Sequence, residues 1–268
     1  DSIVFGDNDG AADTHTLYGG AGTDTVTFSE KDKDVADADF KNVNGVEVLS
    51  IKASADDDNG AETVTLATNA QSAGITTVSL ADADTNVDAS AYTTAITLLA
   101  TATGASGNDM KGGTAADSIV GGAGDNTITT SGGNDTLTGG AGDDDFVIDG
   151  SISAQTVVIT DLGTGAKDSI ATTSIATVNA TVTTASSFTM DAAANSGKVN
   201  VTISDSLVAG QVATFAATGN GYNIDATSND NRIGIVGTDV NDTIKSGTGA
   251  DTITGGKGDD SITGGGGA

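Results

Sequence analysis

Single large apolar residues recur in three groups along this chain, spaced nine residues apart within a group and flanked by polar residues. A lone apolar residue between two small polar ones is typical of a very short strand with one buried side chain. The stretch before each is rich in Gly, which adopts positive-φ turn positions at little cost. These apolar residues are Val26, Ile119, Ile128, Leu137, Phe146, Ile244, Ile253 and Ile262.

The groups follow the pattern G-G-x-G-x-D-x-U-x, where U is the apolar residue. The clearest early copy is 19–27. A second block opens at 104–111, one residue short, and continues through 112–120, 121–129, 130–138 and 139–147. A third block comprises 237–245, 246–254 and 255–263. Residues 264–268 begin a further copy that residues 1–4 would complete in phase, so we expect a piece of a longer protein.

This alternation of turn and short strand predicts an all-β fold, a right-handed parallel β-roll or β-helix solenoid. Two repeats form one coil, and stacked coils build two narrow parallel sheets with turns along both edges. The apolar residue of each repeat points inward.

The segments between the blocks lack the glycine motif but keep short alternating strands at 46–51, 63–66, 77–80, 86–89 and 95–98. Their spacing predicts further β-helix rungs. We therefore divide the chain into a partial repeat block (1–29), a β-helical spacer (30–103), a β-roll block (104–149), a second spacer (150–236) and a final block (237–268). Residues 34–40 fit a short helix and a loop equally well.

Charge makes this solenoid difficult to fold unaided. Asp and Glu number 37 against 10 Lys and Arg, which gives a formal net charge of -27, and aromatic residues make up only 3%. Strong acidity with little apolar surface is typical of chains that do not fold alone. The charge also argues against nucleic acid and anionic lipid as partners. No apolar run is long enough to predict a membrane span.

The turns offer the chemistry that would remove this difficulty. Their carbonyls and the repeated Asp carboxylate face the equivalent turn one coil away, so each cavity is lined by oxygen alone. Hard Ca²⁺ prefers six to eight oxygen ligands, whereas Mg²⁺ suits a carbonyl-rich cage poorly. Stacked Asp columns repel one another unless a cation lies between them. We therefore predict that folding and the binding of several Ca²⁺ ions are coupled.

These nonapeptides resemble the RTX (hemolysin-type) calcium-binding repeats of proteins exported by type I secretion from Gram-negative bacteria. Carried over position by position, the resemblance implies carboxylate or amide ligands at Asp1, Asp24, Asp109, Asp117, Asn126, Asp135, Asp144, Asp242, Asp251 and Asp260. It implies carbonyl ligands or turn positions at Gly19, Gly22, Gly112, Gly121, Gly124, Gly139, Gly142, Gly255 and Gly258. Ala115 and Val240 replace the third glycine in their copies, where we expect weaker or missing sites.

Two spacer segments carry further resemblances. The phrase N-V-N-G-V-E-V-L at 42–49 is similar to a segment of RTX-type bacterial surface-layer proteins, whose Thr, Ala, Gly and Asp bias this chain shares. Residues 159–170 resemble the I-x-D-F-x-x-G-x-D-x-I segment that follows RTX blocks, which implies further oxygen ligands at Asp161 and Asp168. Leu162 and an extra residue before Asp168 depart from that form.

No residue pattern in the chain predicts catalysis. The only histidine, His15, has no metal or nucleophile partner motif and is interpreted as a surface residue, and the acidic run 56–58 as a solvated loop. We expect a structural, non-enzymatic surface-layer component outside a Gram-negative cell, with its own copies and cell-surface polysaccharide as partners. The alternatives are a large RTX adhesin or matrix protein, and the carboxy-terminal module of a secreted enzyme.

Overall fold

The structure is a computed structural model. It describes residues 2–5, 16–28, 34–52, 62–81, 84–101, 103, 106–149, 155–164, 167–172, 176–184, 188–190, 193–195, 197–205 and 207–267. The chain divides into two compact units, Asp1–Asp135 and Thr136–Ala268, so the division falls within the central repeat block. The acidic run 56–58, His15 and Asp1 lie outside the described residues.

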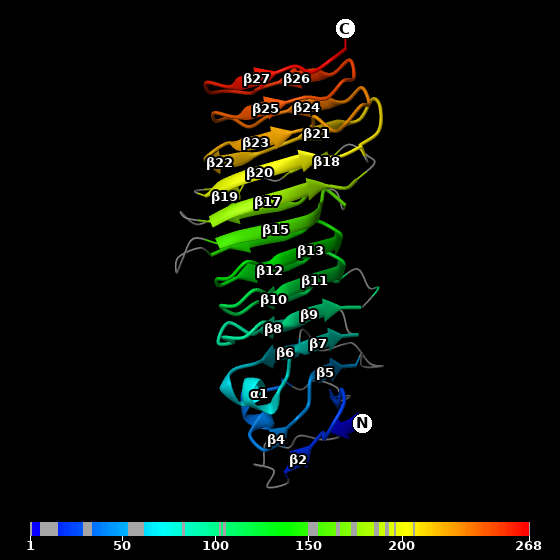
Figure 1. Cartoon of the computed structure of the whole chain (residues 1–268), viewed down its shortest axis with the longest axis vertical. Coiled ribbons are helices and arrows are strands. Elements are labelled where there is room, and N and C mark those ends of the chain that lie inside the picture. The colour runs from blue at the N-terminus through cyan, green and yellow to red at the C-terminus, as the bar shows by residue number, and fades with distance from the viewer. Residues whose placement is uncertain are drawn as a thin grey trace. The chain divides into compact units, whose positions relative to one another are not determined.

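The first unit is built from parallel stacks of short strands (Figure 1). One stack contains β1 (Ser2–Phe5), β3 (Thr25–Phe28), β5 (Val48–Ile51), β7 (Thr77–Leu80), β9 (Thr97–Ala100) and β11 (Ser118–Ala123). A second stack contains β6 (Glu62–Thr65), β8 (Thr85–Asp88), β10 (Asp109–Lys111) and β12 (Thr127–Thr130). The strands β2 (Leu17–Tyr18) and β4 (Val43–Asn44) form a separate pair.

The second unit contains three parallel stacks. The longest has β13 (Thr136–Ala141), β15 (Gln155–Leu162), β17 (Ala176–Val182), β20 (Lys198–Ile203), β23 (Tyr222–Asp225), β25 (Thr243–Lys245) and β27 (Ser261–Thr263). The next has β14 (Asp145–Ile148), β16 (Ser169–Thr172), β19 (Ala193–Asn195) and β22 (Ala217–Gly219). The last has β18 (Phe188–Thr189), β21 (Val212–Thr214), β24 (Gly234–Val236) and β26 (Thr252–Thr254).

The strand register confirms a parallel β-solenoid with two repeats in each coil. Met110 pairs with Ile128 and Ile244 pairs with Ile262, in both cases 18 residues apart and so two repeats on. Between Met110 and Ile128 the chain forms β11 in the opposite stack, where Ile119 is completely buried. The apolar residues therefore stack in columns inside the coil, as the nine-residue spacing predicts.

The spacers continue these stacks. In the first, β5, β7 and β9 lie between β3 and β11 in the same parallel sheet, and their inward side chains Leu49, Val78 and Leu98 are completely buried. The five strands predicted there are confirmed, and each of their ends lies within two residues of the predicted end. In the region of 34–40, the structure has a short 3₁₀ helix at Asp37–Phe40, whose Phe40 is buried.

The α-helix α1 (Thr68–Ala73) had no counterpart in the sequence prediction. It ends at Gly74, whose φ of 105° suits glycine. Its first turn is capped from far away in the sequence, because the Asp37 carboxylate accepts hydrogen bonds from the N–H groups of Ala67, Asn69 and Ala70. No helix in the described part of the chain is long and apolar enough to cross a membrane.

Candidate metal-binding turns

The sixth residue of each repeat lies at the end of a turn, directly before a strand, and its side chain points inward. Of the residues predicted at this position, Asp24, Asp117, Asn126, Asp135, Asp144 and Asp242 are buried, and the spacer adds the buried Asp168. Asp is rarely buried in proteins unless its charge is compensated. A row of such residues therefore requires either hydrogen-bond donors or a cation.

The first carboxylate oxygen of these residues is compensated by the backbone. Oδ1 of Asp135 accepts the N–H of Asp117 at 2.9 Å, and Oδ1 of Asp260 accepts that of Asp242 at 2.9 Å. Asn126 does the same for Asn108 at 2.9 Å. In each pair the residues are 18 apart, so the side chain at one turn receives the N–H of the equivalent residue one coil earlier. We call these columns the sixth-position ladders.

The second carboxylate oxygen distinguishes two kinds of turn. Among the described residues, Oδ2 of Asp135 and Oδ2 of Asp251 are buried with no hydrogen-bond donor. In contrast, Oδ2 of Asp117 accepts the N–H of Gly113 at 2.7 Å. A buried oxygen without a donor loses its hydration and gains nothing in return. Asp135 and Asp251 therefore fit a cation that prefers oxygen ligands.

Burial also shifts the acidities of these carboxylates. Burial, with a contribution from the charge of nearby Asp117, raises the pKa of Asp135 to about 7. Burial likewise raises the pKa of Asp117, and it raises that of Asp168 to about 6. The site thus disfavours the charged carboxylate in the absence of a positive partner. A divalent cation would reverse that preference.

The predicted glycines lie where a side chain would close the turn. A Cβ at Gly19, Gly112, Gly139 or Gly255 would stand 2.8, 2.7, 2.2 or 2.1 Å from the Asp Oδ2 of the same repeat. The third glycine has positive φ in several repeats, as at Gly22 (119°), Gly124 (94°), Gly142 (118°) and Gly258 (99°), but not at Gly249. Gly121 is buried and its carbonyl accepts a hydrogen bond from Asn108 Nδ2 at 3.2 Å.

The sequence predicts Asp109 at the sixth position of its repeat, but in the structure Asn108 occupies that place in the ladder. Asp109 is exposed at the start of β10 and pairs with Thr127, whereas Asn108 is buried and pairs with the sixth-position Asn126. The copy that seemed one residue short is therefore a full nine residues, 103–111, with Asn108 sixth. The alignment on Asp rather than on the apolar Met110 concealed this register.

Two spacer residues join the same scheme. Glu47 precedes β5 in the register of Asp24 and accepts the Asp24 N–H at 2.9 Å. Sequence reasoning missed it, although V-E-V-L aligns with the T-D-T-V of residues 23–26. Asp168 accepts the Asp144 N–H at 3.1 Å on one oxygen and the Gly163 N–H on the other. Asp161 binds the N–H groups of Gly139 and Gly140 at 2.9 and 2.8 Å, so it caps a glycine pair.

Each turn contributes few acidic groups. Within the described ranges, no three His, Cys, Asp or Glu side chains gather closely enough to hold a metal ion. An ion at Asp135 or Asp251 would therefore be held largely by turn carbonyls, with one carboxylate supplying charge. Which of the predicted side chains are calcium ligands stays a prediction.

Turns on a parallel β-roll that hold buried carboxylate oxygens without a donor, as at Asp135 and Asp251, are typical of a calcium-binding solenoid. The comparison with known families agrees: residues 16–29, 111–146 and 236–268 match the family model of the RTX calcium-binding nonapeptide repeat (4 copies). The chain therefore contains RTX calcium-binding nonapeptide repeats, and these repeats bind Ca²⁺. No curated protein and no solved structure matched the chain in the same comparisons.

Proposed function

We propose that this chain is a calcium-dependent structural segment of a bacterial surface-layer protein, exported by type I secretion and without catalytic activity. RTX repeat proteins are typically secreted. The observation that carries the proposal is the continuity of the spacers with the repeats: β5, β7 and β9 extend the sheet that β3 and β11 belong to. In a flexible linker the spacer residues would be irregular, whereas here they form additional rungs of the solenoid.

Calcium would act as the folding signal. With a net charge of -27 and buried carboxylate oxygens that lack a donor at Asp135 and Asp251, the chain is poorly suited to fold where free Ca²⁺ is scarce. It would stay extended in the cytosol, pass through an export channel, and fold outside the cell on meeting Ca²⁺. The same ions would lower the repulsion between acidic copies, which acts over about 8 Å at physiological salt.

The experiment is a Ca²⁺ titration of the full-length protein, followed by circular dichroism for β content and by light scattering for particle size. We expect β structure to form first and particles to grow at higher Ca²⁺, because bridging ions between exposed loops bind less tightly than those in turns. Cryo-electron tomography of the producing cells should show a periodic coat that is lost on deletion of the gene. A protein that folds but stays monomeric in solution and on its own cells would overturn the proposal.

A further inference from the structure

Two repeats that keep Asp at the sixth position but lack the third glycine have turns of a different kind. In the turns 112–117 and 237–242, Ala115 and Val240 stand where five other copies have a positive-φ glycine: Gly22, Gly124, Gly133, Gly142 and Gly258. Asp84 is the only described residue other than glycine with positive φ, so Val240 follows another backbone path. The sixth-position carboxylate responds to this change.

In both turns the carboxylate is held by donors from its own repeat and from the preceding coil. Asp117 accepts the Ile96 N–H at 3.0 Å on Oδ1 and the Gly113 N–H on Oδ2. Asp242 accepts the Tyr222 N–H at 2.7 Å on Oδ1 and the Thr238 N–H at 2.6 Å on Oδ2. We call 112–117 and 237–242 the closed turns. Neither has the open oxygen found at Asp135.

The side chain of Thr238 makes further hydrogen bonds in its turn, which a glycine could not make. Its side chain is buried, and its hydroxyl lies 3.0 Å from both carboxylate oxygens of Asp242 and 3.2 Å from the Val240 carbonyl. The hydroxyl oxygen also accepts the Val240 N–H at 3.2 Å. Thr238 therefore occupies the oxygen-lined space of its turn and donates to the groups that would otherwise face an ion.

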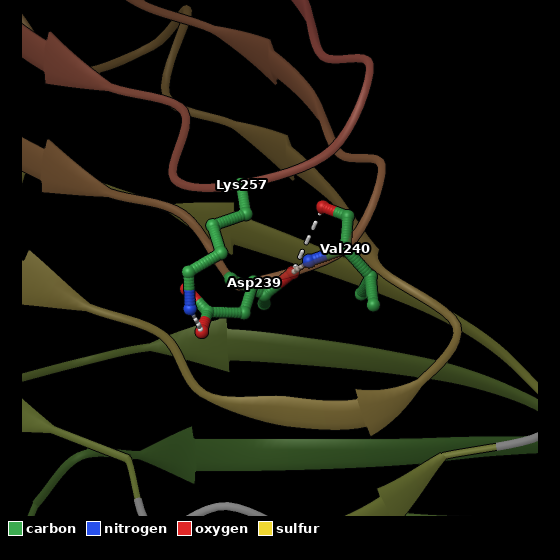
Figure 2. Close-up of polar contacts among 4 residues, drawn as sticks. Asp239, Val240 and Lys257 are labelled. Carbon is green, nitrogen blue, oxygen red and sulfur yellow. Dashed lines mark hydrogen bonds and ion pairs between the residues drawn. The ribbon is translucent and has the colours of Figure 1, made fainter.

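Contacts between the stacked turns 237–242 and 255–260 need no ion either. The Asp242 N–H donates to Asp260, and the Asp259 N–H donates to Oδ1 of Asn241 at 2.8 Å. On the exposed edge, the ammonium of Lys257 pairs with Asp239, as Figure 2 shows beside Val240. An exposed ion pair is worth little by itself. It does place a positive charge where two acidic turns meet.

We propose that the closed turns are calcium-free, and that Thr238 takes the place of the ion in the turn 237–242. The chain would then bind Ca²⁺ at only a subset of its repeats, with Asp135 among the ligands and Asp117 and Asp242 excluded. The third block would be held by protein groups on its 237–242 edge and by Ca²⁺ on its Asp251 edge. This inference does not depend on a surface-layer role.

The test counts Ca²⁺ ions bound to the chain by equilibrium dialysis and native mass spectrometry, with circular dichroism to verify folding. Asp135→Asn and Asp242→Asn are matched variants: each keeps an Oδ1 acceptor for the ladder, as Asn126 does naturally. Asp135→Asn should bind at least one ion fewer than the unaltered chain, whereas Asp117→Asn and Asp242→Asn should bind the same number. Loss of an ion in Asp242→Asn, or none in Asp135→Asn, would overturn the proposal.

A second measurement asks whether the ion can be restored. The double variant Thr238→Gly/Val240→Gly recreates the G-G-x-G pattern and should gain one bound ion. The control Thr248→Gly/Ala250→Gly also adds two glycines, at the third and fifth positions of the next repeat, where the motif allows any residue. Its ion count should not change. An unchanged count in Thr238→Gly/Val240→Gly would show that Thr238 does not stand in for calcium.

Discussion

The backbone N–H of Asp117 donates a 2.9 Å hydrogen bond to Oδ1 of Asp135, which lies 18 residues later and one coil further along. The acceptor's other oxygen, Oδ2, is buried without a donor among the described residues. One side chain thus joins two coils through one oxygen and leaves the other oxygen without a donor. If Asp135 binds Ca²⁺, as we propose, structure and ion binding are linked through the same carboxylate.

Acid should partly replace calcium in folding this chain. Burial raises the pKa of Asp135 to about 7 and that of Asp168 to about 6, both well above the ordinary pKa of Asp, about 3.9. Such groups contribute stability below about pH 4 that is lost as pH rises through the folded pKa. In a chelator, lowering the pH from about 8 to about 5 should therefore increase the β signal in circular dichroism.

The variant Asp135→Asn separates this effect from a general loss of charge. It mimics the protonated side chain, so in a chelator at high pH it should show more β structure than the unaltered chain. Asp109→Asn removes the same charge from an exposed position and should leave the signal unchanged. Equal gains in the two variants would mean that net charge, and not the buried site, controls folding.

The corrected position of Asn108 gives a stability prediction. Its Oδ1 accepts the Thr85 N–H at 3.0 Å and its Nδ2 donates to the Gly121 carbonyl at 3.2 Å. Asn108→Ala leaves both buried groups without a partner and should lower the free energy of unfolding by about 2–4 kcal/mol in saturating Ca²⁺. Asp109→Ala should change it by less than about 0.5 kcal/mol. The reverse order in urea denaturation would restore Asp109 to the ladder.

A row of asparagines on the outer face of the second unit forms another ladder. Asn200 Nδ2 donates to Asn179 at 2.8 Å, and Asn223 Nδ2 donates to Asn200 at 2.9 Å, across β17, β20 and β23. Asn200→Ala removes two of these bonds and should cost about 1–2 kcal/mol of unfolding free energy. Asn223→Ala removes one and should cost about half as much. Similar costs would mean that the ladder bonds contribute little.

Much of this fold is readable from the sequence because each repeat contains its own turn and its own buried residue. The nine-residue spacing predicts the coil, and the register of Ile128 on Met110 agrees with it. The helix α1 was not predictable, since the Asp37 carboxylate that caps it lies some 30 residues away. Asn108 was missed for a related reason: the burial of Met110, and not the presence of an Asp, decides the register.

The hydrogen-bond partners of the second carboxylate oxygens likewise could not be predicted from the sequence. Asp117 and Asp135 occupy the same place in the motif, yet one accepts two N–H groups and the other only one. The difference follows from the backbone path of each turn. Ala115 indicates an altered turn, but only the structure shows that the Gly113 N–H donates to Asp117.

The central claim, that calcium binding and folding are one process, is tested most directly by circular dichroism of the purified chain in chelator, in millimolar Mg²⁺ and in millimolar Ca²⁺. The account predicts a largely disordered spectrum in the first two conditions and a β spectrum only with Ca²⁺, because turn carbonyls and a single carboxylate suit the larger ion. A chain that shows the full β spectrum in excess chelator at neutral pH would contradict it.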